Sequence, residues 1–348
     1  MSKENLIEVK NLNKTFTKKV GRHFFNRKNV PIHAVNNISI EIKKGETLGI
    51  IGESGCGKTT TARMLLRLQK ETHGEILFNG TDLCKLNERE TSKFLPNMQM
   101  IFQDPYDTLN PGMRVVDLLM EPINAHMKGI SHNEKIEIIK ESIEAIDLKP
   151  AERFMYRYPH ELSGGQRQRI AIARAIILKP DFIAADEPTS MLDVSVRAGI
   201  LNLLLKLKKQ MGLTMLFITH DLTTASYMCD RIAVMYQGEV VEVGNTEKII
   251  RNPSHPYTRA LVSVVTDLNH FIENRDRIIL DGEVDATIEK KGCIFVHRCP
   301  FREEHCFHDP PSLVTQQGDH QVACSCLDKI PSGLPKDQSL QQQNSHSI

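Results

Sequence analysis

The chain has 348 residues, of which 40% are hydrophobic and 25% charged. This composition is that of an ordinary globular protein with room for one large domain and one small one. Its 44 basic residues nearly balance its 43 acidic ones, which argues against a nucleic-acid partner or an acidic substrate. The sequence has no apolar run of the roughly 18 residues that span a bilayer, and its opening, MSKENLIEVK, lacks the apolar stretch of a signal peptide. We therefore expect the chain in the cytosol.

Short apolar segments alternate with helical patterns through the first two thirds of the chain, which predicts an α/β domain with a largely parallel sheet. Buried parallel strands are short and almost uniformly apolar. The segments of that kind are 47–51, 181–185 and 214–219. A hairpin over 231–236 and 240–243, which turns at Gln237 and Gly238, closes the predicted domain.

Two regions depart from this alternation. Between Asp117 and Pro159 the sequence is mostly helical and charged, which predicts a helical insertion. After Gly244 prolines, cysteines and histidines accumulate in a small irregular module, and the ending SLQQQNSHSI has the composition of a disordered tail. The predicted boundaries are a large domain over 1–250 with its insertion at about 105–165, a small module over 251–332 and a tail over 333–348.

The segment after the first of these strands carries the strongest chemical signal. It reads GESGCGKT and precedes the helical pattern TTARMLLRL, which is the strand, loop and helix context of a P-loop. Glycines let the backbone curl until successive N–H groups point at phosphate oxygens. We expect Lys58 to reach the β- and γ-phosphates and Thr59 to offer its hydroxyl to Mg²⁺, while Cys56 is a small filler. The predicted nucleotide-binding residues are Gly52, Glu53, Ser54, Gly55, Cys56, Gly57, Lys58, Thr59 and Thr60.

A second signal is DFIAADE, an apolar strand that ends in two carboxylates. Asp186 would hold the Mg²⁺ ion, and Glu187 would orient or polarise the attacking water. A carboxylate pair at a strand end can also be a solvated loop. Together with the P-loop, the pair predicts a nucleoside-triphosphate hydrolase.

The class of hydrolase is narrowed by LSGGQ, which begins at Leu162 and is followed by RQRIAIARAI. Its serine and glycines suit a helix N-terminus that contacts phosphate. On these residues the chain resembles the ABC ATPase family over residues 5–244. The family's Q-loop is matched by Gln103 in MIFQDP, its D-loop by Asp193 in SMLD and its switch histidine by His220 in ITHD.

The resemblance implies a P-loop NTPase cassette with a RecA-like core, an antiparallel β subdomain and a helical insertion. It also implies a head-to-tail dimer, in which the LSGGQ segment of one cassette caps the ATP on the other. The catalytic residues implied are Glu187, His220 and Gln103. His220 would contact the γ-phosphate, and Gln103 would bind the Mg²⁺ and connect the metal site to the transmembrane subunits. The further nucleotide-binding residues implied are Ser163, Gly164, Gly165, Gln166 and Asp193.

One aromatic residue upstream of the P-loop usually stacks on adenine in this family. Phe16, in NLNKTFTKK, is the candidate here, and the alternative is an apolar strand residue in the core. Met191 departs from the family, where small residues are common, and we infer no loss of activity from it.

The flanks of the cassette bear on the cargo. QMIFQDPYDTLNP, HPYTRALV and the ending GCIFVHRCPF to HQVACSC resemble the oligopeptide and dipeptide importers, and the longer N-terminal hairpin resembles the second of their two ATPase subunits. The resemblance implies a heterodimer with a related ATPase subunit, two transmembrane permease subunits and an extracytoplasmic peptide-binding protein. It also implies a peripheral location on the cytoplasmic side of the cell membrane.

The sequence leaves two alternative functions open. Nickel and other small-solute importers are built on related cassettes that often lack a cysteine-rich ending. A soluble ABC ATPase acting on ribosomes or DNA would normally carry two cassettes or a long coiled coil, and neither pattern occurs here.

Five of the eight cysteines crowd into the last sixty residues with the spacing C-x5-C-x6-C-x17-C-x-C. Sets of thiolates at such spacing can hold zinc or an iron–sulfur cluster, and free thiols are a further alternative. The resemblance favours a [4Fe–4S] cluster on Cys293, Cys299, Cys306 and Cys324. Because the chain reads Cys-Ser-Cys where the family commonly reads Cys-His, Cys326 is the alternative fourth ligand.

Overall fold

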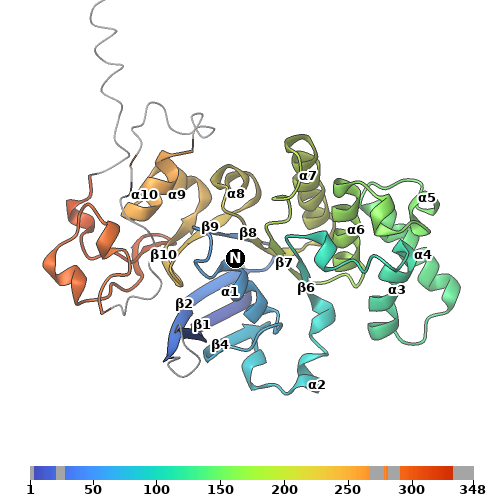
Figure 1. The fold of residues 1–348 in the computed structure, drawn as a ribbon, viewed down its shortest axis with the longest axis horizontal. Helices are drawn as coiled ribbons and strands as arrows, with labels where there is room; N and C mark the ends of the chain where they lie inside the picture. Colours follow the sequence, from blue (N-terminus) through green and yellow to red (C-terminus); the bar gives the residue numbers. More distant parts are fainter. Residues whose placement is uncertain (1–3, 21–27, 266–277, 279, 281–290, 332–348) are drawn as a thin grey trace, which may run out of the picture.

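The computed structural model describes residues 4–20, 28–265, 278, 280 and 291–331. Two sheets form its centre, and Figure 1 shows the larger one running across the molecule with layers on both sides. The predicted tail over 333–348 lies outside the described residues. The helices are α1 (Lys58–Leu65), α2 (Glu88–Thr91), α3 (Val115–His126), α4 (His132–Ala145), α5 (Glu152–Met155), α6 (Gly164–Ile176), α7 (Val194–Met211), α8 (Leu222–Met228), α9 (Thr246–Arg251) and α10 (Pro256–Ser263).

The smaller sheet is antiparallel, with the strand order β2-β1-β4-β5. Its inward residues alternate with polar ones, as in Ile38 and Ile40, which are buried on either side of the exposed Ser39, because successive side chains of a strand point to opposite faces. Val9 pairs with Ile40 across the sheet. Its strands are β1 (Asn5–Val20), β2 (Lys28–Lys43), β4 (His73–Phe78) and β5 (Thr81–Asp82).

The larger sheet has the order β11-β12-β10-β9-β3-β8-β7-β6, and its part from β9 to β6 is parallel. Every residue of β3, β7 and β8 is buried, which agrees with the uniformly apolar segments in the sequence. Its strands are β3 (Thr47–Ile51), β6 (Met98–Ile101), β7 (Phe182–Asp186), β8 (Thr214–Ile218), β9 (Arg231–Tyr236), β10 (Glu239–Asn245), β11 (Val314–Gln317) and β12 (His320–Val322).

The two faces of this sheet pack into different cores. Ile183 and Phe217 belong to the core shared with α6, α7, α8 and α10, whereas Phe182 and Leu216 belong to the core shared with α1 and the antiparallel sheet. In Figure 1 the helices from α7 to α10 accordingly lie on one side of the sheet, and α1 with β1, β2 and β4 on the other. This is the layered arrangement of an α/β protein.

Helices α3, α4 and α5 form a separate helical subdomain with α6, at the right of Figure 1. They contribute buried aliphatic residues such as Leu119, Ile139 and Ile143 to the core. The predicted fold class, a cassette core with an antiparallel subdomain and a helical insertion, is confirmed.

The C-terminal module is more closely tied to the cassette than its irregular sequence suggests. Short 3₁₀ turns carry much of it, but the hairpin of β11 and β12 extends the main sheet by pairing with β10. Glu242 of β10 is fully buried and accepts hydrogen bonds from the N–H groups of Ser254 and His255 and lies 2.7 Å from His320 Nε2 on β12. The division into domains at residue 250 stays a prediction, and these contacts cross it.

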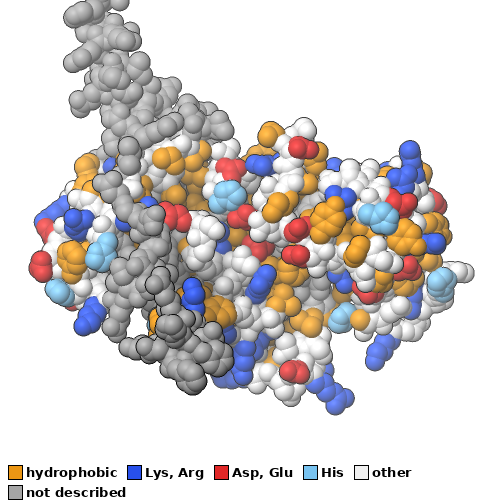
Figure 2. Space-filling view, viewed as in Figure 1, with side chains coloured by type: hydrophobic (Ala, Val, Ile, Leu, Met, Phe, Trp, Pro, Cys, Tyr) orange, Lys and Arg blue, Asp and Glu red, His pale blue; other side chains and the backbone are white. Residues whose placement is uncertain are grey.

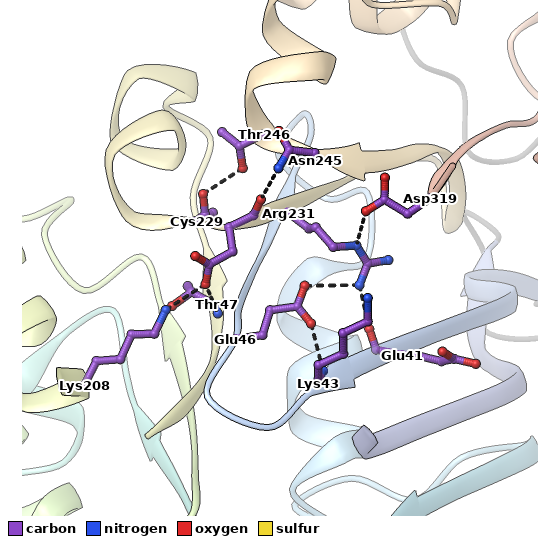
Figure 3. A network of polar contacts seen from close by, with 11 residues as sticks. Glu41, Lys43, Glu46, Thr47, Lys208, Cys229, Arg231, Asn245, Thr246 and Asp319 are labelled. Atoms are coloured by element: carbon purple, nitrogen blue, oxygen red, sulfur yellow. Dashed lines mark hydrogen bonds and ion pairs between the residues drawn. The ribbon is translucent and has the colours of Figure 1, made fainter. Parts of the chain in front are cut away.

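A polar network joins the two sheets and the C-terminal module at Arg231, the first residue of β9 (Figure 3). The Arg231 guanidinium lies 3.1 Å from Glu46 Oε1 and donates to the Glu41 carbonyl of β2, and its Nε lies 3.6 Å from Asp319 Oδ2. Asp230 accepts from the Thr47 N–H at 2.7 Å. Residues far apart in sequence are thus fixed together at one edge of the parallel strands.

The surface fits the near-neutral composition. On the face shown in Figure 2, basic and acidic side chains are interspersed over the helical subdomain at the right. None of the helices in the described part of the chain is long and apolar enough to cross a membrane.

Candidate functional site

The P-loop lies between β3 and α1 in a backbone conformation that depends on glycine. Gly52 and Gly57 have φ angles of 153° and 103°, which L side chains rarely adopt. A Cβ at Gly52 would lie 2.1 Å from the Met235 carbonyl oxygen, and one at Gly57 would lie 2.2 Å from that of Ala34. The loop is therefore packed against neighbouring backbone, and its N–H groups stand at the start of α1.

Lys58 is buried at the base of the loop, where its Nζ donates to the carbonyl oxygens of Gly52 at 2.7 Å and Glu53 at 2.9 Å. Its ammonium is thus held beneath the loop, in reach of an anion bound there. The Cys56 Sγ lies 3.9 Å from the same nitrogen. Because burial raises the pKa of the Cys56 thiol, this cysteine is protonated at neutral pH and its role as a filler fits.

A hydroxyl and a carboxylate meet beside the loop. The Thr59 hydroxyl, in the first turn of α1, donates to Asp186 Oδ1 at 3.1 Å, at the end of β7. Burial raises the pKa of Asp186, and this effect outweighs the Thr59 hydrogen bond and the charges of Arg63 and Lys58, which act in the opposite direction. Hydroxyl and carboxylate oxygens are the ligands that Mg²⁺ prefers, so these two residues fit a magnesium ion.

Glu187, the next residue, is held by two polar side chains. Its Oε1 lies 3.1 Å from His220 Nδ1, and its Oε2 accepts from Gln103 Nε2 at 3.3 Å. Glu187 also has a φ of 44°, a left-handed conformation that is costly for a residue with a side chain and that is found at functional sites.

The side chains of Lys58, Thr59, Gln103, Glu187 and His220 open onto one cavity of about 470 Å³, whereas Asp186 and Cys56 are not among its lining residues. It brings together the P-loop, the Q-loop glutamine, the acidic strand end and the histidine, which lie on four separate segments of the chain. The lining residues are Ala34, Ser54, Gly55, Gly57, Lys58, Thr59, Thr60, Gln103, Glu187 and His220.

The LSGGQ segment lies elsewhere, at the N-terminus of α6. Ser163 is the N-cap, and it forms a capping box with Gln166 in which each side chain bonds the other residue's N–H. Gly165 packs so closely on α7 that a Cβ would lie 2.5 Å from Val196 Cγ1. The residues that line the cavity include none from this segment.

Two further predicted residues have distinct surroundings. Phe16 is 41% exposed on β1, with Lys14 Nζ 5.2 Å from its ring centre, and it is not among the residues that line the cavity. Its exposure argues against the alternative of a core residue. Asp193 precedes α7 next to the exposed Met191 and Val194, on the same part of the surface as LSGGQ, since Leu192 lies close to Gly164.

The cysteines of the C-terminal module converge on a second, much smaller cavity of about 20 Å³. All eight cysteines of the chain are free thiols. Burial raises the pKa of Cys293 to about 12 and that of Cys299 to about 11. The cysteines that line this cavity are Cys293, Cys299, Cys306, Cys324 and Cys326.

Three ligand atoms lie especially close together in this module. Cys306 Sγ lies 3.6 Å from Cys326 Sγ, and His305 Nε2 lies 3.7 Å from both sulfurs. These separations are near the ~3.8 Å between ligands of a tetrahedral zinc ion with Zn–S bonds of about 2.3 Å. The pKa values of Cys293 and Cys299, in contrast, are raised mainly by burial and further by the neighbouring thiols of Cys306 and Cys324.

Two residues that bind the P-loop were not identified from the sequence. The Tyr257 hydroxyl accepts a hydrogen bond from the Glu53 N–H, and Arg298 forms an ion pair with the Glu53 carboxylate. Tyr257 lies in the segment HPYTRALV, which carried a family resemblance but no role. No local pattern indicates that these residues reach a loop about two hundred positions earlier.

The cavity has the features of a nucleoside-triphosphate site of the P-loop class. These features are the P-loop itself, the Thr59–Asp186 pair beside it, and Glu187, which is held by His220 and Gln103. Comparison with known families agrees. Residues 35–190 match the ABC transporter family, and residues 241–306 match the oligopeptide/dipeptide transporter C-terminal region.

Two known relatives are similar to the chain over nearly their whole length. A putative oligopeptide transport ATP-binding protein of Bacillus subtilis, YkfD, is 45% identical over 87% of this chain and 92% of its own. The oligopeptide transport ATP-binding protein AppF of the same organism is 42% identical over 93% and 98%. The chain therefore belongs to the ATP-binding proteins of ABC transporters, in the oligopeptide transport family.

A solved structure shares the cassette fold. It is the dimeric post-hydrolysis state of the ATP-binding cassette MJ0796 bound to ADP and Pi, with a TM-score of 0.60 and 32% identity over 69% of this chain and 98% of that one.

Proposed function

We propose that the chain is the ATP-hydrolysing subunit of an ABC importer for dipeptides or oligopeptides. The observation that carries the proposal is the single cavity in which Gln103, Glu187 and His220 face Lys58 and Thr59. The names of the relatives YkfD and AppF, both oligopeptide transport proteins, support peptide over nickel as the cargo.

In the proposed site, the N–H groups of the P-loop and the Lys58 ammonium bind the triphosphate. Thr59, Asp186 and Gln103 would hold an Mg²⁺ ion, which would neutralise charge on the phosphates. Glu187 accepts a proton from the attacking water, and His220, which already lies 3.1 Å from it, contacts the γ-phosphate. Phe16 is the residue proposed to stack on adenine, and its exposure on β1 supports this role.

Hydrolysis requires a second cassette in this proposal. The N-terminus of α6, with Ser163 as its cap, is free of the chain's own cavity, and the exposed apolar side chains of Met191 and Val194 lie near it. A partner packed head to tail would cover this surface and bring its own ATP to LSGGQ. The dimeric cassette structure supports such pairing, and we propose that the partner is a related ATPase subunit.

One of the two permease subunits is proposed to dock in a groove of about 360 Å³ beside the Q-loop. It includes Phe102, next to Gln103, and the half-exposed Leu68, and its rim carries the ion pair of Glu121 with Arg174 at 3.1 Å. An apolar groove with a charged rim suits a short amphipathic segment of a membrane protein. This placement makes the chain a peripheral protein on the cytoplasmic side of the membrane. The permease subunits, not this chain, receive peptide from an extracytoplasmic binding protein.

For the cysteine module we propose a [4Fe–4S] cluster on Cys293, Cys299, Cys306 and Cys324. The donor set fits, because these thiols line one cavity and burial raises the pKa of Cys293, Cys299 and Cys324, so that a cation would favour their ionised form. When bound, such a cluster would cross-link three separate turns. Zinc on His305, Cys306 and Cys326 is the alternative that the short separations favour.

The function is tested by purifying the chain together with the two permease subunits. ATP hydrolysis by this complex is then measured with empty and with peptide-loaded binding protein. Stimulation by peptide is expected. A complex that hydrolyses ATP but responds to nickel alone would contradict the peptide assignment. For the metal, a broad absorbance near 400 nm in anaerobically purified protein supports the cluster, and stoichiometric zinc without iron would refute it.

A further inference from the structure

Glu53 of the P-loop has each of its polar groups bound by another residue. Its N–H donates to the Tyr257 hydroxyl at 3.0 Å, and its C=O accepts from Lys58 Nζ at 2.9 Å. Its two carboxylate oxygens lie 3.0 and 3.1 Å from Arg298 Nη1. Tyr257 lies on α10 and Arg298 ends the 3₁₀ turn Val296–Arg298, so two of these contacts come from residues that follow the matched cassette.

The two contacting residues are themselves fixed by a cluster of aromatic rings. The ring of Tyr257 lies 4.7 Å from that of Tyr236 and 5.7 Å from that of Phe295, and all three residues are buried. The Arg298 guanidinium lies 5.8 Å from the Tyr236 ring, and its Nη1 lies 3.4 Å from the Tyr236 hydroxyl. Because such rings have few rotamers and are closely packed, the hydroxyl of Tyr257 and the charge of Arg298 have defined positions.

The arrangement also has an electrostatic consequence. Glu53 does not line the nucleotide cavity, whereas its neighbours Ser54 and Gly55 do. A free carboxylate at this position would repel the negative charges of a triphosphate one or two residues away. Arg298 neutralises that carboxylate and draws it toward the C-terminal module, where the Arg298 side chain is only 12% exposed.

We propose that Tyr257 and Arg298 are positioning residues of the nucleotide site, through which the cysteine module sets the affinity of the P-loop for ATP. Tyr257 fixes the first peptide of the loop, and Arg298 cancels the charge of Glu53. The link to the module is direct, because Phe295 and Arg298 lie between Cys293 and Cys299. The inference rests on the proposed nucleotide site and is independent of the cargo and of the metal.

The test is calorimetric titration of MgATP into the full chain. Every protein compared also carries Glu187→Gln, so that ATP is bound but not hydrolysed during the titration. Arg298→Ala is expected to weaken binding about three- to tenfold, the range for losing one partly exposed ion pair beside a charged ligand. Tyr257→Phe, which keeps the ring and removes the acceptor of the Glu53 N–H, is expected to weaken it as well. Arg302→Ala is the control, because Arg302 is in the same module and bonds only the His297 carbonyl among the described residues.

The decisive comparison is a double-mutant cycle with Glu53→Gln. When the carboxylate is absent, Arg298→Ala is expected to change the affinity by less than about twofold, because the interaction it removes no longer exists. A loss of the same size with and without Glu53 would overturn the proposal, as would an Arg298→Ala chain that binds MgATP like Arg302→Ala. If Arg298→Ala lowers the unfolding temperature strongly, Arg298→Gln, which keeps most of the side-chain volume, carries the same expectation. A parent chain that binds no MgATP would instead contradict the nucleotide site itself.

Discussion

His220 Nδ1 lies 3.1 Å from Glu187 Oε1, just beyond the ends of two adjacent parallel strands, β8 and β7. The other oxygen of Glu187 is held by Gln103 at 3.3 Å. The glutamate is therefore oriented from both sides, which is the preorganisation that a general base would require.

Replacement of Glu187 by Gln is expected to abolish turnover and preserve ATP binding. The amide keeps the size and most of the contacts of the carboxylate, but it cannot accept the proton of the attacking water. A loss of about 10² to 10⁴ in kcat is expected for a removed general base, with the Kd for MgATP changed less than about twofold. Steady-state hydrolysis together with calorimetry measures both, and retained hydrolysis would show that another group is the base.

Ser163→Ala is expected to act on stability and on the partner's ATP. Loss of the N-cap of α6 costs about 1 kcal/mol of unfolding free energy. Hydrolysis by the assembled pair should fall, while MgATP binding to the single chain should not change, because Ser163 does not line the chain's own cavity. A weaker single-chain affinity would contradict the expected action in trans.

The pH dependence of stability should carry the signature of His255. This buried histidine accepts from the Tyr257 N–H through Nδ1, and its burial lowers its pKa from 6.5 to about 4. The unfolded chain binds the proton first as the pH falls, so about 3 kcal/mol of stability is lost between pH 6.5 and 4 and is fully present above that window. His255→Asn retains a capping oxygen but does not titrate.

Urea unfolding of both chains at several pH values gives the comparison. The variant is expected to lose less stability than the parent across this window, whatever its absolute stability at neutral pH. Parallel curves for the two chains would mean that His255 is not buried as a neutral imidazole.

The choice between Cys324 and Cys326 as cluster ligand can be made by iron content. Cys324→Ser is expected to lower the iron per chain and the absorbance near 400 nm strongly, because Cys324 interacts with Cys293 and Cys299. Cys326→Ser should leave both nearly unchanged. If Cys326→Ser loses more iron than Cys324→Ser, Cys326 is the fourth ligand. If both Cys326→Ser and His305→Ala lose zinc, the zinc site on His305, Cys306 and Cys326 is favoured.

The proposed permease groove can be tested with a charge. Leu68 is 55% exposed and lines the groove, so Leu68→Glu should reduce copurification with the permease subunits at little cost in stability. Val264→Glu is a matched control, since Val264 is 51% exposed and is not among the groove residues. Equal copurification of both variants would place the docking surface elsewhere.

The parts of this molecule that the sequence predicted are those encoded locally. The strand, loop and helix around Lys58 and the buried strand before Asp186 are each specified by a short run of residues, so their chemistry could be assigned before the fold was known. The strands 47–51 and 231–236 are found at the predicted bounds.

The remaining features depend on contacts between distant segments. Glu53 and Arg298 are separated by 245 positions, and neither residue type indicates the other. The pairing of β12 with β10 involves only a few residues, too short and too polar to stand out as a strand. The exposure of Phe16 depends on the curvature and pairing of β1, which no local pattern defines.

The contact between Glu242 and His320 has a consequence for synthesis of the chain on the ribosome. Glu242 of strand β10 is made 78 positions before its partner His320 of β12. During that interval the edge of the sheet is unpaired and the Glu242 carboxylate lacks its imidazole. Unpaired strand edges invite pairing with other chains. The nascent cassette therefore completes its sheet only when the last segment of the cysteine module emerges, and a truncated product is the form most exposed to aggregation.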